Sequence, residues 1–245
     1  MTRPASCSYH HKSGSHPVLL GTRLAVTARA RFAEDRLATS VKAGTSQYVI
    51  LGAGLDTFAV RSRLGDGISI FEVDEPETSN WKREVLHAAG LPIPDNLGLI
   101  AGDLRDASLI DLLRDAGLQI DHPAFTSWLG VSMYLPLEAI RSTLLALSSL
   151  ATGSEVILDH VLPPDQRDAA GAQYAEFAES VGAANAEPWL TALGLADVRS
   201  LVAACGWEVV EQPLLERWVE PRLWDRADDL KPSVLWAICH GRIAT

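Results

Sequence analysis

The run LGAGLD, residues 51–56, places two glycines and a carboxylate directly after a stretch of apolar residues. Gly52 and Gly54 leave the backbone bare, so a ligand can approach it closely, and Asp56 follows two residues later. A dinucleotide-binding turn would carry a third glycine where this chain has Thr57. Because a carboxylate attracts a cation and repels a phosphate, we expect this turn to hold an ammonium or sulfonium group.

Further acids end the next two apolar runs. In FEVDEP, Glu72 and Asp74 alternate with Val73 and therefore share one face of a strand. Asp74 lies twenty residues after Gly54, where an acid can accept hydrogen bonds from ribose hydroxyls. In AGDLRD, Asp103 is placed to bind an adenine amino group. The pattern predicts an adenosine-like ligand that lacks phosphate.

The fourth apolar run leads into SWLGVSMYLP, which offers Trp128 and Leu129 as apolar surfaces beside the ligand. Each signal also has a purely structural interpretation. A glycine turn can simply be tight, and Asp74 or Asp103 can cap a helix. Trp128 and Tyr134 can belong to the core. We favour the ligand site because all of these residues follow successive strands, at the edge where such folds bind ligands.

The apolar pattern predicts the elements that must position these residues. Short apolar runs predict strands at 47–51, 68–73, 97–101, 125–129, 155–162, 207–211 and 233–239. Helical spacing predicts helices at 19–41, 76–89, 107–116, 136–150, 166–181 and 198–205, with one or two helical turns within 55–63.

Strands that alternate with helices indicate the α/β class, with a mostly parallel seven-stranded sheet and helices on both faces. The last two strands are close in sequence with no clear helix between them, so we expect them to form an antiparallel edge. We expect one domain over 18–245 after a flexible, polar tail at 1–17. His10 and His11 of this tail could bind a metal, but a solvated tail is the stronger interpretation, and no metal site is predicted.

The amino-acid composition limits the classes of partner that the protein can bind. With 245 residues, of which 47% are hydrophobic, the chain can bury a full core. A net charge of -10 argues against nucleic acid and acidic membrane surfaces, and no apolar run is long enough to span a membrane. The three widely spaced cysteines indicate a reducing, cytoplasmic location. We expect a small-molecule or peptide partner, and the oligomeric state stays open.

Several motifs together resemble the leucine carboxyl methyltransferase-like family of S-adenosylmethionine-dependent methyltransferases. They are QYVILGAGLDTFAVR, FEVDEPET, AGDLRD, MYLPLEAI and, in the N-terminal helix, TARARFAED. In the family's order, they cover about residues 20–150. The resemblance implies a Rossmann-like class I methyltransferase fold and S-adenosylmethionine as cofactor.

The resemblance implies that Gly52 and Gly54 line the methionine part of the cofactor, that Asp74 holds the ribose, and that Asp103 and Leu104 contact adenine. Arg29 would pair with the methionine carboxylate or with a substrate carboxylate, since a guanidinium fork suits either. Arg31 is the alternative, and both arginines could equally be solvated helix charges. The predicted cofactor-binding residues are Arg29, Gly52, Ala53, Gly54, Asp56, Glu72, Asp74, Asp103, Leu104, Trp128 and Leu129, and Arg31 and Tyr134 are predicted to position the substrate.

The chain departs from the family pattern at two positions. Phe58 stands where the family's glycine motif usually has arginine, which leaves Arg61 as the basic residue of that turn. Leu129 stands where many members have a glutamate. These changes argue against transferring the founding enzyme's substrate, a protein C-terminal leucine carboxylate.

The predicted reaction is O-methylation of a carboxylate or hydroxyl of a small molecule or peptide. A carboxylate is ionised at neutral pH and needs no base, whereas a hydroxyl would need one, with Tyr134 or His160 as candidates. No catalytic residue is assigned. The alternatives are an NAD-dependent oxidoreductase, which Thr57 disfavours, and a non-catalytic module that binds S-adenosylmethionine.

Overall fold

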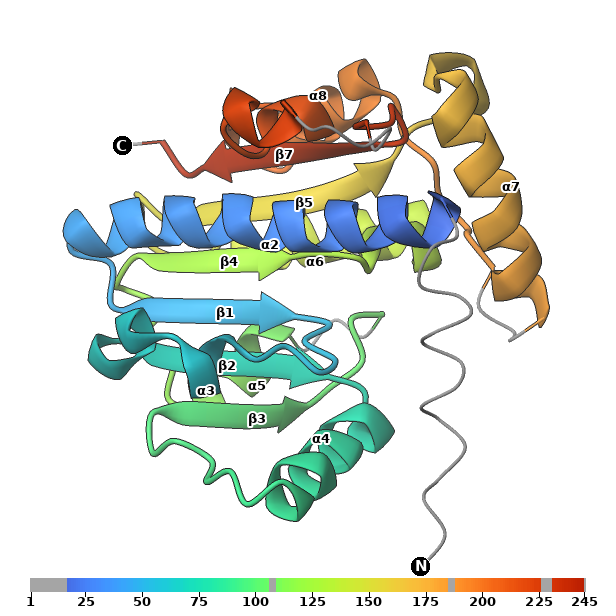
Figure 1. The fold of residues 1–245 in the computed structure, drawn as a ribbon. Helices are drawn as coiled ribbons and strands as arrows, with labels where there is room; N and C mark the ends of the chain where they lie inside the picture. Colours follow the sequence, from blue (N-terminus) through green and yellow to red (C-terminus); the bar gives the residue numbers. More distant parts are fainter. Residues whose placement is uncertain (1–16, 106–108, 185–187, 226–230, 245) are drawn as a thin grey trace, which may run out of the picture.

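The computed structural model describes residues 17–105, 109–184, 188–225 and 231–244, so the predicted tail lies outside the described residues except for Pro17. A single seven-stranded sheet with the order β3-β2-β1-β4-β5-β7-β6 forms the centre of the molecule (Figure 1). Its strands are β1 (Gln47–Leu51), β2 (Ser69–Asp74), β3 (Leu97–Ala101), β4 (Ala124–Trp128), β5 (Glu155–Val161), β6 (Glu208–Glu211) and β7 (Trp236–Arg242).

The first five strands are parallel, and β7 is antiparallel to both β5 and β6. The strands of the parallel part are short apolar runs because helices cover both of their faces. Every residue of β1 and β4 is buried. The predicted α/β class, the mostly parallel sheet and its antiparallel edge are therefore confirmed.

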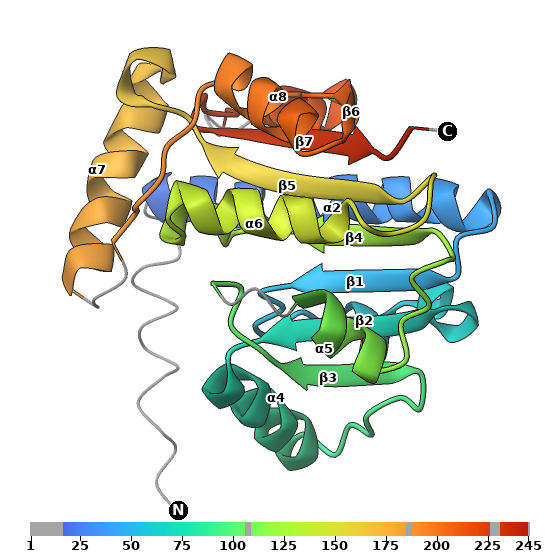
Figure 2. The same ribbon diagram turned by 180° about the vertical axis from the view of Figure 1, so that it is seen from behind.

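Helices lie on both faces of the sheet, with α2 in front of it in Figure 1 and α6 in front of it in Figure 2. The helices are α2 (Pro17–Lys42), α3 (Phe58–Arg61), α4 (Pro76–Ala88), α5 (Leu109–Asp115), α6 (Leu137–Leu147), α7 (Ala169–Ala184) and α8 (Leu195–Ala204). None of the helices in the described ranges is long and apolar enough to cross a bilayer.

Two apolar clusters hold these layers together. On one face, Phe32 and Leu37 of α2 pack with Ile50 of β1. On the other face, Ile140 and Leu144 of α6 join a second cluster that includes β1, β2 and β4. Each such fully buried side chain stabilises the fold by about 1.5–3 kcal/mol. The long N-terminal helix is thus fixed to the sheet from Ala25 to Val41.

The predicted bounds of the last strand differ from those in the structure. The last strand was expected at 233–239, but β7 runs Trp236–Arg242 and pairs with the whole of β5. Its polar end was missed because His240 and Arg242 interrupt the apolar pattern. Both side chains bind Glu155, the first residue of β5, which explains how charged residues extend this strand.

Strands β1 and β4 are neighbours in the sheet although they are far apart in sequence, so the order in which successive strands are added reverses between them. Strand β2 lies on one side of this pair and β5 on the other. In an α/β sheet, the carboxyl ends at such a point form the ligand-binding crevice. Helix α7 stands beyond these strand ends, at the right of the sheet in Figure 1.

Candidate functional site

The glycine turn after β1 has the left-handed backbone that glycine favours, with φ values of 63° at Gly52 and 51° at Gly54. The backbone N–H of Gly52 donates to the carbonyl of Val73 at 2.8 Å. A Cβ atom at Gly52 would collide with the side chain of Val131, which follows β4. A glycine at this position therefore lets the ends of β1 and β4 approach each other.

Asp74, the last residue of β2, holds this turn. Its Oδ2 accepts a hydrogen bond of 2.6 Å from the backbone N–H of Gly54, and its Oδ1 accepts one of 2.7 Å from that of Glu75. A carboxylate has about four acceptor positions, so capacity remains for further hydroxyl donors. Ala53, between the two glycines, is buried.

A cavity of about 570 Å³ lies at these strand ends. We call it the strand-end cavity. The cavity is lined by Gly52 of the glycine turn, by Asp74 at the end of β2 and by residues at the start of α4. Residues 102–105, 131, 134–135, 188 and 190 complete the described lining. The predicted residues Gly52, Asp74, Asp103, Leu104 and Tyr134 therefore meet around one space.

The described lining of this cavity carries more acidic than basic side chains. Asp103 accepts hydrogen bonds from the backbone and side chain of Arg105, and these bonds hold the pKa of its carboxyl below the usual range. Arg105 also contacts Glu75 at 3.3 Å. Three carboxylates and one arginine thus line the described part of the cavity. The carboxylates can accept hydrogen bonds from ribose hydroxyls and attract a cation, so the lining fits S-adenosylmethionine better than a pyrophosphate.

The described lining of this cavity lacks eight of the predicted residues: Arg29, Arg31, Ala53, Gly54, Asp56, Glu72, Trp128 and Leu129. Asp56 accepts a hydrogen bond of 2.6 Å from the backbone N–H of Phe58 and so stabilises the start of α3. Glu72 is buried in an ion pair with Lys82 of α4, and burial raises the pKa of its carboxyl. Trp128 is fully buried in the core, and Leu129 packs on the cluster beneath α2.

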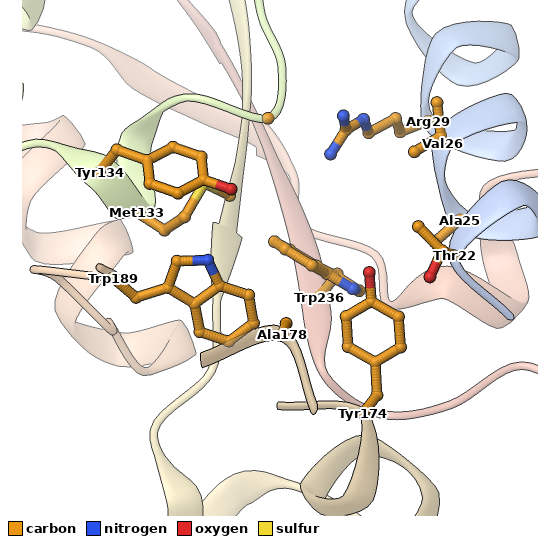
Figure 3. A pocket seen from close by; sticks show the side chains of 11 residues that line it. Thr22, Ala25, Val26, Arg29, Met133, Tyr134, Tyr174, Ala178, Trp189 and Trp236 are labelled. Atoms are coloured by element: carbon orange, nitrogen blue, oxygen red, sulfur yellow. The ribbon is translucent and has the colours of Figure 1, made fainter. Parts of the chain in front are cut away.

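A second cavity of about 170 Å³ lies between α2, α7 and the strand ends. Figure 3 shows Tyr134, Trp189, Trp236 and Tyr174 around it, with the guanidinium of Arg29 pointing in from α2. We call it the aromatic pocket. Tyr134 also lines the strand-end cavity, and Gly130 of the aromatic pocket precedes Val131 of that cavity. The two spaces therefore adjoin at the end of β4.

Asp159 of β5 fixes Arg29 in place. Its Oδ2 lies 2.8 Å from Nη1 of Arg29, and its Oδ1 accepts a hydrogen bond of 2.6 Å from the backbone N–H of Gly130. The side chain of Asp159 is 0% exposed and that of Arg29 is 18% exposed. Asp159 was not among the predicted residues, although an aspartate inside the apolar run VILDHV is a signal, because a buried charge requires a partner.

Arg31 and His160 have other roles. Arg31 is exposed and pairs with Asp35 one turn along α2, at 2.8 Å, so it is a solvated helix charge. His160 is buried, and its ring Nδ1 lies 2.9 Å from the carbonyl of Leu193. Burial lowers its pKa to about 4. Neither residue belongs to the described lining of the two cavities.

Over the described ranges, no three histidine, cysteine, aspartate or glutamate side chains gather in a way that could hold a metal ion.

The model of the leucine carboxyl methyltransferase family matches residues 5–148 of this chain. A Bacillus subtilis relative, named as an S-adenosyl-L-methionine-dependent methyltransferase, is 32% identical over 186 residues, which are 75% of this chain and 61% of that protein. The chain thus spans less than two thirds of that relative's length.

Two crystal structures share the fold. A Streptomyces avermitilis protein from a family of unassigned function aligns with a TM-score of 0.70 at 18% identity, over 94% of this chain and 87% of its own. A Thermobifida fusca protein named as a methyltransferase aligns with a TM-score of 0.65 at 20% identity, over 91% of this chain and 82% of its own.

Proposed function

The chain belongs to the leucine carboxyl methyltransferase family, and we propose that it is an S-adenosylmethionine-dependent methyltransferase. The observation that carries this proposal is the contact of Asp74 with the glycine turn at the edge of an acidic cavity. We further propose that residues 18–245 act as one domain in the cytoplasm. The buried, free thiols of Cys205 and Cys239 suit a reducing compartment.

The strand-end cavity would hold the cofactor. Asp74 would accept the ribose hydroxyls, Asp103 would bind the adenine amino group, and Leu104 would pack on the ring. When bound, S-adenosylmethionine supplies a methyl carbon that an acceptor oxygen attacks with a lone pair, while the C–S bond breaks and its electrons remain on sulfur. The residues of this chain position the two partners and exclude water.

The aromatic pocket would hold the acceptor, and its lining favours a carboxylate over a hydroxyl. No histidine, aspartate or glutamate appears among the described lining residues, so no side chain of ordinary basicity is placed to remove a proton. Burial raises the pKa of Tyr174, and His160 lies elsewhere. An acceptor that is already ionised avoids this requirement. We therefore propose O-methylation of a carboxylate of a small molecule or peptide.

Arg29 lines the aromatic pocket, and its guanidinium lies against Gly130, where the two cavities adjoin, so it is placed to bind a carboxylate. That group would be the methionine carboxylate of the cofactor or the carboxylate of the acceptor. The Arg29→Lys variant separates these roles. A weaker affinity for S-adenosylhomocysteine would assign Arg29 to the cofactor, and an unchanged affinity with a raised acceptor KM would assign it to the acceptor.

Calorimetric titration of the purified protein with S-adenosylhomocysteine tests the proposal. We expect saturable binding of one molecule per chain, and radiolabelled S-adenosylmethionine should then transfer its methyl group to a carboxylate in a panel of acceptors. Saturable binding of NADH without binding of S-adenosylhomocysteine would support a dehydrogenase instead. Binding of S-adenosylhomocysteine with no transfer to any acceptor would support a non-catalytic module.

A further inference from the structure

We infer that the methyl acceptor is a monocyclic aromatic carboxylic acid whose ring lies in the aromatic pocket. This inference rests on the proposed function and names its substrate class. Three aromatic side chains from separate segments carry it: Tyr174 of α7, Trp189 of the segment between α7 and α8, and Trp236 of β7.

These three rings already pack edge to face. The ring centroids of Tyr174 and Trp236 lie 6.2 Å apart at 73°, and those of Trp189 and Trp236 lie 5.5 Å apart at 72°. Aromatic rings prefer such contacts because the positive edge of one ring meets the negative face of another. All three also line the pocket, so an aromatic ring that enters can extend this packing.

The size of the pocket fits one ring. Its volume is about 170 Å³. An apolar protein cavity of about 150 Å³ can bind benzene, so a single ring matches this space. A fused polycyclic acceptor or a long alkyl chain would have to extend beyond the pocket.

The polar groups of the pocket favour an anion at one end of the ring. Arg29 uses Nη1 to bind Asp159, and its other guanidinium nitrogens make no hydrogen bond within the described part of the chain. Figure 3 shows the guanidinium of Arg29 and the hydroxyl of Tyr134 pointing into the same space. Tyr134 lines both cavities and the guanidinium of Arg29 lies against Gly130, where they adjoin, so a carboxylate bound there would meet the methyl group.

The transfer balances without a base. A carboxylate oxygen forms the new C–O bond, sulfur keeps the electrons of the broken C–S bond, and the product is a neutral methyl ester. No proton is released.

Aromatic rings also attract cations, so an amine is the competing ligand. An ammonium group in this pocket would face the positive charge of Arg29, and the described lining offers no carboxylate to bind it. Asp159 is fully buried and already paired with Arg29. These charges favour the acid.

The test titrates three small ligands into protein saturated with S-adenosylhomocysteine. Benzoate and cyclohexanecarboxylate have the same charge and similar size, and they differ in aromaticity, whereas benzylamine reverses the charge. Benzoate should bind about 2- to 10-fold more tightly than cyclohexanecarboxylate, the range that edge-to-face contacts contribute. Benzoate should also accept the methyl group from radiolabelled S-adenosylmethionine.

Two results would overturn the inference while the proposed function stands. One is equal or tighter binding of cyclohexanecarboxylate or benzylamine by protein that binds S-adenosylhomocysteine. The other is methyl transfer to aliphatic acids but not to benzoate. If the wild-type protein fails to bind S-adenosylhomocysteine, the proposed function and the inference both fail.

Variants at Trp189 check the ring contact. Trp189 is partly exposed, so its replacement disturbs the core less than that of the buried Trp236. Trp189→Phe should keep the preference for benzoate, and Trp189→Leu should reduce it at least 2-fold with an unchanged affinity for S-adenosylhomocysteine. Trp81→Leu is the matched control, because Trp81 is 51% exposed on α4 and outside the lining of both cavities. An unchanged preference in Trp189→Leu would contradict the inference.

Discussion

The backbone N–H of Gly54 donates a hydrogen bond of 2.6 Å to Oδ2 of Asp74, and this bond joins the turn after β1 to the end of β2. The acid therefore has two tasks in the proposed account. It sets the shape of the glycine turn, and it offers its remaining acceptor positions to the ribose of the cofactor. Replacing it should affect binding through both.

The first prediction concerns Asp74. Asp74→Ala should weaken the affinity for S-adenosylhomocysteine about 10- to 100-fold, because hydrogen bonds to a charged group contribute about 1.5–3 kcal/mol. Asp74→Asn should lose less, since its amide oxygen can still accept from Gly54. Calorimetry measures both. Asp111→Asn is the control, because Asp111 is an exposed residue of α5 that pairs with Arg114 and should leave the affinity unchanged.

The second prediction concerns Arg29 and stability. Arg29→Ala removes the partner of the fully buried Asp159. Breaking a buried ion pair on one side costs about 3–5 kcal/mol, and we expect the lower end because Arg29 is partly exposed. Urea unfolding should show this loss as a lower urea concentration at the midpoint of the transition. Arg31→Ala, two residues away, should change the free energy of unfolding by less than about 0.5 kcal/mol. Similar losses of unfolding free energy in the two variants would contradict a stabilising role for the ion pair between Arg29 and Asp159.

The third prediction is that Glu72 stabilises the fold through Lys82 and does not bind the cofactor. Lys82→Met leaves the buried Glu72 without its ion-pair partner and should destabilise the protein by about 3 kcal/mol. The double variant Glu72→Gln/Lys82→Met should recover most of that loss, because it removes both buried charges. Neither the double variant nor Glu72→Gln should change the affinity for S-adenosylhomocysteine. A 10-fold loss of affinity in Glu72→Gln would return Glu72 to the cofactor site.

The fourth prediction concerns pH and His160. Burial lowers its pKa from 6.5 to about 4, so the folded protein disfavours its charged form. As the pH falls below 6.5, the unfolded chain binds a proton that the folded chain does not, and stability falls until about pH 4. One pKa unit corresponds to about 1.4 kcal/mol, so the decline should approach about 3 kcal/mol. Urea unfolding between pH 4 and 7 measures it. His160→Gln should flatten the profile over this range, and an equally steep profile in that variant would assign the decline to other groups.

The sequence predicts the strand-end cavity well because its motifs are local. Each acid lies within a few residues of a strand end, and parallel strands bring those ends to one edge, so Asp74, Asp103 and Leu104 meet as expected. The sequence pattern could not show that Asp56 and Glu72 lie outside the described lining of this cavity. These carboxylates have the same spacing signals, but their partners, the backbone of Phe58 and the side chain of Lys82, are visible only in the fold.

The aromatic pocket could not be predicted from spacing. Its walls come from α2, α7, the segment after it and β7, which are separated by long stretches of sequence. They meet because β7 returns antiparallel beside β5 and α7 stands across the strand ends (Figures 1 and 2). Arg29 was predicted from the family resemblance, but its ion-pair partner Asp159 lies 130 residues further along the chain and was not predicted.

A crystal structure of the protein with S-adenosylhomocysteine tests the central claim most directly. We expect the ligand to fill the strand-end cavity, with its ribose hydroxyls within hydrogen-bonding distance of Asp74 and its sulfur facing the aromatic pocket near Tyr134. A ligand bound elsewhere, or an Asp74 carboxylate that makes no contact with the ribose, would contradict this claim.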